Sequence, residues 1–261
     1  DPGAAEDLSA RGLAAAIDDE GRIRCTVTMF YALATAGRVD DSAQHLPALQ
    51  AAIDGDASIA MRQLAAHALV DATMGTEQLG EAVEQCARLS EQMGEIQVAR
   101  SWMNRGNVML FGTDPPDLEG GIAASRREIG LATEVDAVEV AAWAKIQLAH
   151  ALSTGGYDGA HEAVRSALAG SFDVHYALAM ATAVETCARH LASTGDIEAA
   201  AVLLGHLDVD AAPFALGAGL RADLASAVAG TERLEALTAM GAAMDRRDAV
   251  EYALERLDAA G

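Results

Sequence analysis

The feature that most constrains this chain is a short phrase that returns about every forty residues. Its clearest copies are Thr35–Ser42, Thr154–Ala160 and Thr194–Ala200. In each copy a glycine is followed two places later by an apolar residue, three places later by an acid and five places later by a small residue. Weaker copies surround Gly75 and Gly112, so the glycine anchors fall at 37, 75, 112, 155 and 195. A period of this length indicates a stacked helical repeat.

The phrase has the chemistry of a tight connection between two helices. We expect each anchoring glycine to take the left-handed conformation just after one helix, and the acid to lie in the first turn of the next. The small residue, Gly80 in the copy around Gly75, would let the two antiparallel helices approach closely. Helical stretches flank the anchors, such as 96–111 and 138–153 before them and 79–93 and 160–168 after them, and 114–117 reads as an insertion.

Composition supports the same class of fold. Only 4% of the residues are aromatic while 51% are hydrophobic, so the core must consist of Ala, Leu, Val, Ile and Met. These residues favour helix packing more than strands. A helical hairpin cannot bury its apolar face alone, so successive hairpins must stack. We therefore predict an all-α, tetratricopeptide-like α-solenoid of antiparallel helix hairpins with a C-terminal helical cap.

The repeat also predicts how the chain is organised. Residues 1–21 form an orphan helix from a preceding repeat, 22–210 form five hairpins, and 211–261 form the capping helices, where the period breaks at Pro213. The last helix, expected over 245–257, is rich in charge, as the end of a solenoid requires. Because the chain begins with Asp1 and an unpartnered helix, we expect it to be a fragment of a longer polypeptide.

The charge of the chain bears on its partners and location. Its formal net charge is −21, which argues against direct binding to nucleic acid or to an anionic membrane. Cys25, Cys86 and Cys187 are widely spaced and there is no signal peptide, so we expect reduced thiols in the cytoplasm. No apolar run reaches the roughly 18 residues of a membrane span.

Two runs near the C-terminus, 187–205 and 241–254, carry a family resemblance. They resemble the C-terminal repeat region of actinobacterial LuxR-type, MalT-like transcriptional regulators and of their adenylate-cyclase-like ATPase relatives. In that family the repeats follow a nucleotide-binding module, can precede a DNA-binding helix-turn-helix, and sense an inducer or partner. The resemblance implies the same sensing role here. It covers about a third of the chain well, and the family's phosphate loop and DNA-binding domain lie outside this sequence.

Familiar catalytic and metal motifs are incomplete. Lys145 follows an alanine, which excludes a Gly-Lys-Ser/Thr phosphate loop. His161 and Glu162 begin like a zinc-protease helix, but Arg165 stands where the second histidine is needed. The glycine-rich run 217–222 lacks a preceding strand, so we interpret it as a loop before a cap helix. The seven histidines show no paired ligand spacing. We predict no catalytic residue, no metal and no cofactor.

The repeat does predict a ligand-binding surface. In tetratricopeptide arrays the first helix of each pair lines a concave groove, and the corresponding positions here are Arg24, Tyr31, Thr35, Arg62, Thr73, Trp102, Lys145, Glu185 and Arg189. Arginine clamps carboxylates and tryptophan offers an apolar platform, which suits an acidic peptide or a small anionic effector. Asn107 joins this set because Gly106-Asn107 resembles a dipeptide of peptide-binding repeats. In the alternative interpretation the arginines pair with acids between repeats, Trp102 and Trp143 fill the core, and the asparagine ties one helix to the next.

These observations favour a non-catalytic, cytoplasmic interaction or effector-sensing domain of a larger bacterial transcriptional or signalling regulator. Its expected partner is a protein, an acidic peptide or a small anionic effector, and a homodimer is a further expectation. Two other classes remain open at this point. One is an all-helical enzyme with an unrecognised site, and the other is a structural spacer or dimerisation arm.

Overall fold

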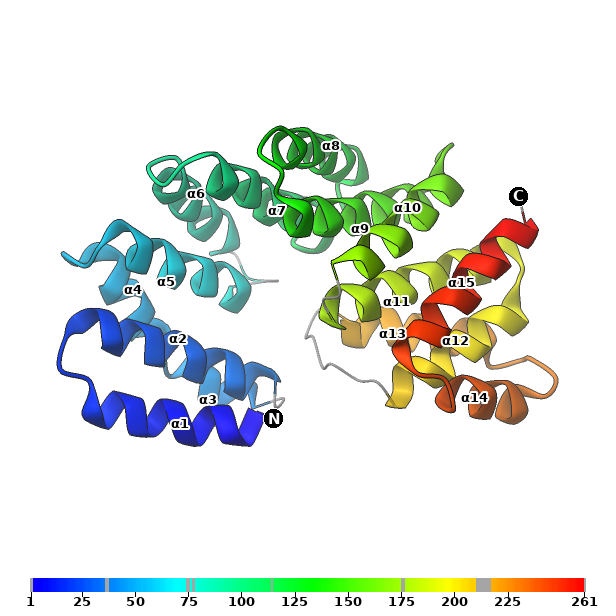
Figure 1. The fold of residues 1–261 in the computed structure, drawn as a ribbon, viewed down its shortest axis with the longest axis horizontal. Coiled ribbons are helices and arrows are strands. Elements are labelled where there is room, and N and C mark those ends of the chain that lie inside the picture. The colour runs from blue at the N-terminus through cyan, green and yellow to red at the C-terminus, as the bar shows by residue number, and fades with distance from the viewer. Residues whose placement is uncertain are drawn as a thin grey trace. The chain divides into compact units, whose positions relative to one another are not determined.

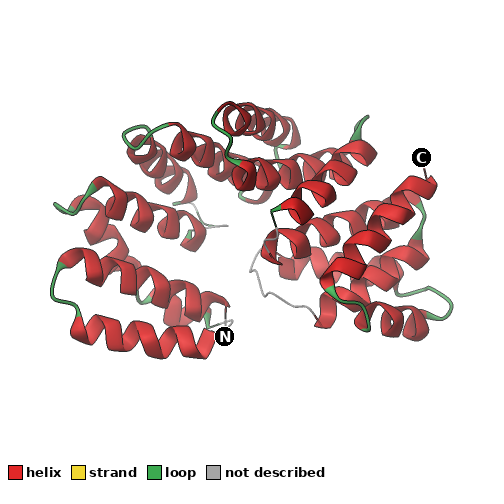
Figure 2. Cartoon of the chain, in the orientation of Figure 1, coloured by secondary structure: helices red, strands yellow, loops and turns green. Residues whose placement is uncertain are grey.

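The structure is a computed structural model that describes residues 2–35, 38–73, 76, 78–113, 115–174, 177–209 and 217–260. Within these ranges the chain consists of α-helices joined by turns and contains no strand, as Figures 1 and 2 show. The predicted all-α class is confirmed. The helix contacts divide the chain into two compact units, residues 1–116 and 117–261, which are described separately below. Their boundary falls in the stretch that the sequence marks as an insertion.

Unit 1 consists of α1 (Pro2–Ala15), α2 (Asp19–Thr35), α3 (Val39–Ala43), α4 (Leu46–Asp54), α5 (Ile59–Ala72), α6 (Leu79–Ser90) and α7 (Glu95–Phe111). Helix α1 packs on α2, α4 on α5, and α6 on both α5 and α7, while α2 also contacts α5. The core gathers around the fully buried side chains of Leu49, Ile53 and Val70. Helices adjacent in sequence are therefore also adjacent in space.

Unit 2 consists of α8 (Leu118–Glu134), α9 (Val138–Gly155), α10 (Ala160–Asp173), α11 (Ala177–Thr194), α12 (Ile197–Val209), α13 (Gly217–Val228), α14 (Leu234–Ala242) and α15 (Arg246–Ala260). From α8 to α12 each helix contacts the next, and α9 also contacts α11. The last helix, α15, packs against α10, α11 and α12. The C-terminal helix thus folds back over the preceding helices.

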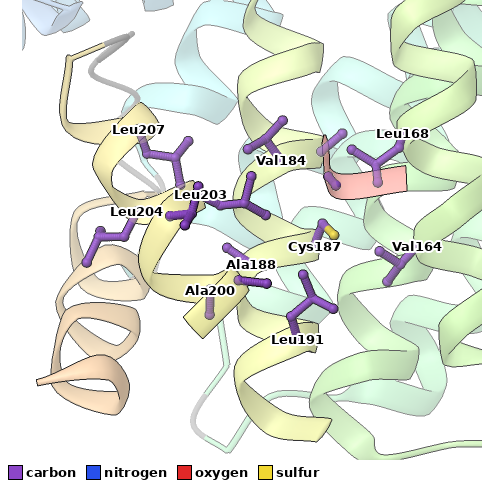
Figure 3. Packing of buried hydrophobic residues seen from close by; sticks show 14 of the residues in the cluster. Val164, Leu168, Val184, Cys187, Ala188, Leu191, Ala200, Leu203, Leu204 and Leu207 are labelled. Carbon is purple, nitrogen blue, oxygen red and sulfur yellow. The ribbon is translucent and has the colours of Figure 1, made fainter. Parts of the chain in front are cut away.

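The core of unit 2 is aliphatic, as the composition requires. Figure 3 shows leucine, valine and alanine side chains from α10, α11 and α12 meeting around Cys187. Leu168, Leu191 and Leu203 are almost completely buried there. Two ion pairs attach α15 at the surface, from Arg165 to Asp258 at 2.8 Å and from Arg256 to Asp196 at 2.6 Å.

The turns confirm the predicted glycine chemistry only in part. After α11, Gly195 has a φ of 98°, and the amide N–H of Asp196 donates to the carbonyl of Leu191, as in a Schellman motif. After α9 the left-handed residue is Gly156, one place beyond the predicted Gly155. Gly112 has a φ of −100° and ends α7 without a left-handed turn, so the prediction is wrong there. The anchors at 37 and 75 lie outside the described residues.

The small residue of the phrase also behaves differently from copy to copy. Ser42, Ala160 and Ala200 are buried, which fits close helix packing. At Gly80, however, a Cβ atom would meet no atom within 4 Å, so the expected close approach is wrong at that position. The tightest contact between described helices involves Gly205 of α12 and Gly241 of α14, where a Cβ would overlap the backbone of the opposite helix.

The five-hairpin solenoid over 22–210 stays a prediction, because it extends across the boundary between the two units. Among the helices of the described ranges, none combines the length and apolar character needed to cross a membrane.

Candidate functional site

Unit 1 holds seven of the predicted groove residues, and the side-chain contacts of Tyr31, Arg62 and Trp102 are the most informative. The Tyr31 hydroxyl donates to Oδ2 of Asp71 at 2.7 Å. Nε of Arg62 donates to the carbonyl oxygen of Ile53 at 2.8 Å, so this cation ties α5 to the end of α4. The Arg105 guanidinium lies 4.9 Å from the ring centroid of Trp102.

The remaining predicted residues occupy varied positions, with Thr73 buried at the end of α5 and Glu185 buried on α11. Arg24 is exposed on α2, and Asn107 is half-buried on α7. Lys145 of α9 lies against Gly170 of α10. Arg189 of α11 lines a polar pocket. The side chain of Thr35 lies outside the described residues. The predicted set is therefore divided between two units, and Arg189 is its member at a pocket.

The pocket lies between α9 and α11 and has a volume of about 230 Å³. Its lining consists of His150, Ser153, Thr154, Thr186, Arg189 and Ser193. His150 and Thr186 are buried, whereas Thr154 and Ser193 are exposed, so the lining runs from a buried floor to an open rim. Every lining side chain is polar and one is permanently charged. This chemistry suits a small polar ligand better than an apolar one.

Arg189 and His150 form the polar floor of the pocket. Nη1 of Arg189 lies 3.0 Å from Nδ1 of His150. Because arginine can only donate, Nδ1 must accept and the imidazole proton must be on Nε2. Burial, reinforced by the adjacent guanidinium, lowers the pKa of His150 to about 3. The histidine is therefore neutral at pH 7 and does not itself offset the charge of Arg189.

Acidic residues near Arg189 moderate its charge. Burial lowers the pKa of Arg189, while Glu185 and Asp223 act in the opposite direction. Burial raises the pKa of Glu185, whose Oε2 lies 3.5 Å from Nη2 of Arg221. Glu185 is thus shared between two arginines. Asp223, which is exposed on α13, is a second acid that acts on Arg189.

The hydroxyl groups of the pocket present acceptors to a ligand. The Thr186 hydroxyl donates to the carbonyl of Thr182 at 2.9 Å, and the Ser193 hydroxyl donates to the carbonyl of His190 at 2.8 Å. Each hydroxyl proton is thereby used within α11, and the oxygen lone pairs remain as acceptors. Arg189 is a donor and these two residues are acceptors, so the pocket offers both kinds of group.

The pocket lies at the carbonyl ends of α9 and α11, where the helix dipole disfavours an anion. That effect is about 0.3–1 kcal/mol per helix end. The terminal carbonyls of Leu152 and Leu191 already accept from the amides of Tyr157 and Asp196, which reduces it. Hydrogen bonds between a guanidinium and an anion contribute about 1.5–3 kcal/mol each. The attraction of an anion to Arg189 therefore exceeds its repulsion from the two helix ends.

Ser153 and His190 form a second polar pair beside the pocket. The Ser153 hydroxyl lies 3.0 Å from Nδ1 of His190, and the His161 ring contacts the His190 ring edge-to-face with centroids 5.7 Å apart. Burial and the nearby His161 both lower the pKa of His190. A catalytic base of a serine nucleophile needs its protonated form stabilised. The surroundings of His190 instead favour its neutral form.

Contacts at the spacing of the sequence repeat explain how the pocket arises and which pattern could have predicted it. Polar side chains 37 to 40 positions apart meet between helices that are not consecutive in the chain: Tyr31 with Asp71, His67 with Asn104, His150 with Arg189, and Ser153 with His190. These separations match the period of the glycine phrase. Sequence reasoning predicted Arg189 but missed its partner. Aligning polar residues at the repeat spacing would have identified His150.

Within the described ranges, histidine, cysteine and acidic side chains form no group able to hold a metal ion. The thiols of Cys86 and Cys187 are buried, and burial raises the pKa of Cys86 to about 11. Neither thiol has the character of a nucleophile. No protein-family model matches the chain, and comparison with curated proteins gives no match either.

Proposed function

We propose that this chain is a non-catalytic, cytoplasmic sensing and interaction module of a larger bacterial transcriptional or signalling regulator, with an anionic effector bound in the Arg189 pocket. The regulator assignment rests on the resemblance carried by residues 187–205 and 241–254. The effector assignment rests on the pocket itself. Paired helices with a polar pocket between successive pairs provide a surface on which a ligand can alter helix packing.

One observation carries the proposal. Arg189 is a half-buried cation whose hydrogen-bond partner is a neutral histidine, in a pocket lined by hydroxyl groups. A partly desolvated charge of this kind gains more from an incoming anion than an exposed one does. On a chain with a net charge of −21, this pocket has a cation and no acid among its lining residues, which favours an anion locally.

The test is a thermal-shift and calorimetric screen of the full chain against small carboxylates, phosphates and an acidic hexapeptide. We expect at least one anion to raise Tm in a concentration-dependent way, as ligand binding to the native state requires. The Arg189→Gln variant should lose that shift, whereas Arg165→Gln, which removes an exposed ion pair elsewhere in unit 2, should keep it. Equal shifts in both variants, or no shift with any anion, would contradict the proposal.

A purely structural spacer or dimerisation arm makes a different prediction. It would self-associate without a ligand-dependent change in Tm. Sedimentation analysis run alongside the screen separates the two functions. A stable oligomer with a Tm that no anion changes would favour the spacer.

A further inference from the structure

The pocket selects a particular class of anion, and this inference rests on the proposed function. We propose that its ligand is a compact anion that carries hydroxyl groups next to its charge, such as a sugar acid or a sugar phosphate. The argument uses the size of the pocket and the direction of its hydrogen bonds.

The volume of the pocket excludes most larger classes of ligand. Sites for drug-sized ligands have volumes of about 300–1,000 Å³. At about 230 Å³ this pocket accommodates a smaller molecule, and a peptide would extend well beyond it. The single guanidinium in the lining matches one carboxylate or one phosphate group.

The hydrogen bonds define the rest of the ligand. Arg189 can only donate, so it requires an acceptor, which an anionic oxygen supplies. Thr186 and Ser193 already donate to carbonyls of α11, so each offers lone pairs and requires a donor from the ligand. A carboxylate or phosphate ester has no donor when ionised, but a hydroxyl group beside it does. The complementary ligand therefore combines one anionic group with neighbouring hydroxyls.

The positions of the lining residues on α11 place these groups. Thr186 is buried one turn before Arg189, and Ser193 is exposed one turn after it. An anion held by Arg189 would therefore meet these two oxygens through hydroxyl groups on either side of its charge. An unhydroxylated anion would leave the Thr186 oxygen facing an apolar chain, which costs binding free energy.

Matched probes on the full chain test the inference by calorimetry. Gluconate and hexanoate have the same carbon number and charge but differ in their hydroxyls, while glucose has the hydroxyls without the charge. Glucose 6-phosphate and methyl phosphate form the equivalent pair for a phosphate source, because the methyl phosphate dianion carries no hydroxyl group. We expect the hydroxylated anion of one pair to bind about tenfold or more tightly than its partner, since each hydrogen bond lost costs several-fold in affinity. Glucose should bind weakly.

Substitutions at Thr186 and Arg189 separate the contributions of the hydroxyl and the guanidinium to ligand binding. Thr186→Val, which keeps the shape and removes the hydroxyl, should weaken the hydroxylated anion about fivefold to tenfold and leave hexanoate or methyl phosphate unchanged. Arg189→Gln should abolish binding of every anion, and Arg189→Lys should retain part of it. Far-UV circular dichroism confirms that each variant is folded.

Equal affinity for gluconate and hexanoate and for both phosphates, with Arg189 still required, would overturn this inference and leave the proposed function standing. Binding of the acidic hexapeptide through Arg189 without binding of either hydroxylated anion would have the same consequence. Failure of every anion to bind would overturn both this inference and the proposed function.

Discussion

Glu128 of α8 is a carboxyl group buried without a partner. Its side chain is fully buried, and neither carboxyl oxygen has a hydrogen-bond partner among the described residues. Burial raises the pKa of Glu128 to about 9, so the group is neutral at pH 7. The folded chain therefore keeps a proton that the unfolded chain releases above pH 4.5. This contribution to stability is complete below pH 4.5 and is lost as the pH rises through about 9.

The Glu128→Gln variant should remove this dependence. Between pH 5.5 and 8.5 the wild type should lose up to about 1.4 kcal/mol of unfolding free energy per pH unit from this group. The amide variant has no proton to release, so its stability should vary less over that range. Urea denaturation at the two pH values measures the difference. Glu134→Gln, at an exposed position near the end of the same helix, should behave like the wild type, and equal pH slopes in all three proteins would contradict the assignment.

The pH dependence of stability that His150 contributes is opposite to that of Glu128. Its folded pKa of about 3 lies below the ordinary value of 6.5, so the unfolded chain binds a proton more readily in this range. The stability associated with neutral His150 is complete above pH 6.5 and is lost as the pH falls toward 3. Protonation would also remove the acceptor of Arg189. Affinity for a carboxylate ligand, measured by calorimetry, should therefore change little from pH 8 to 6, and a sharp transition near pH 6.5 that His150→Gln removes would contradict the structure.

Arg62, which the sequence predicts to bind ligand, also makes a structural contact. Its bond to the Ile53 carbonyl closes the end of α4. Arg62→Gln should lower the unfolding free energy by about 1 kcal/mol. Anion binding at the Arg189 pocket should be unaffected, as calorimetry can show. Loss of binding in this variant with stability unchanged would restore Arg62 to the ligand site.

At the scale of elements, the crossing of α12 and α14 depends on two glycines. A Cβ on Gly241 would overlap the carbonyl of Val202, and a Cβ on Gly205 would overlap that of Thr238. Both glycines belong to the runs that carry the family resemblance. The backbones approach so closely that any side chain must separate the two helices. The resemblance thus coincides with a packing requirement in unit 2.

Gly241→Ala should destabilise unit 2 by about 1–3 kcal/mol or more, because the helices must separate to admit one methyl group. Gly130→Ala is the matched control. Gly130 is within α8, and a Cβ there would meet nothing within 4 Å, so alanine should raise stability by about 0.5–1 kcal/mol through helix propensity. Chemical denaturation gives both values. A neutral Gly241→Ala variant would show that α12 and α14 do not cross as described.

Much of the element order could be predicted from sequence, because helices follow from local chemistry. The helix expected over 138–153 is α9, and the charged helix expected over 245–257 is α15. The predictions that were wrong concern backbone conformation and helix contacts, which the spacing of residues in the sequence does not specify. Two glycines stand together at 155 and 156, and only the backbone shows that the second is left-handed. Gly80 has the right spacing but faces open space.

The ligand pocket was less predictable, because it depends on which side chains meet across repeats. The predicted groove positions included Arg189, but the other cations among them lie away from the pocket. Arg62, for example, donates to the carbonyl oxygen of Ile53. His150, Thr186 and Ser193 each look unremarkable in the sequence. They form a site because α9 and α11 lie side by side, and that proximity arises from tertiary packing.

At the scale of the whole molecule, the described residues form a hydrophobic core in each unit. One cluster extends from Ile23 to Val108 in unit 1 and the other from Trp143 to Leu257 in unit 2. Because each unit buries its own apolar residues, each has the means to fold independently. The proposed ligand site belongs entirely to unit 2.

Residues 117–261 should therefore fold when produced alone. We expect a helical circular dichroism spectrum, a cooperative melting transition and retention of anion binding. Residues 1–116 alone should fold but bind no anion through this mechanism. A disordered or aggregated 117–261 fragment would show that its core needs unit 1.

The most direct test of the central claim, that the Arg189 pocket is the functional site, is hydrogen–deuterium exchange of the full chain with and without a saturating anion from the screen. The method locates the ligand without assuming which residues bind it. The structure predicts slower exchange in the last turns of α9 and α11, over 150–154 and 186–193. Protection confined to other helices, or none at a concentration that raises Tm, would contradict it.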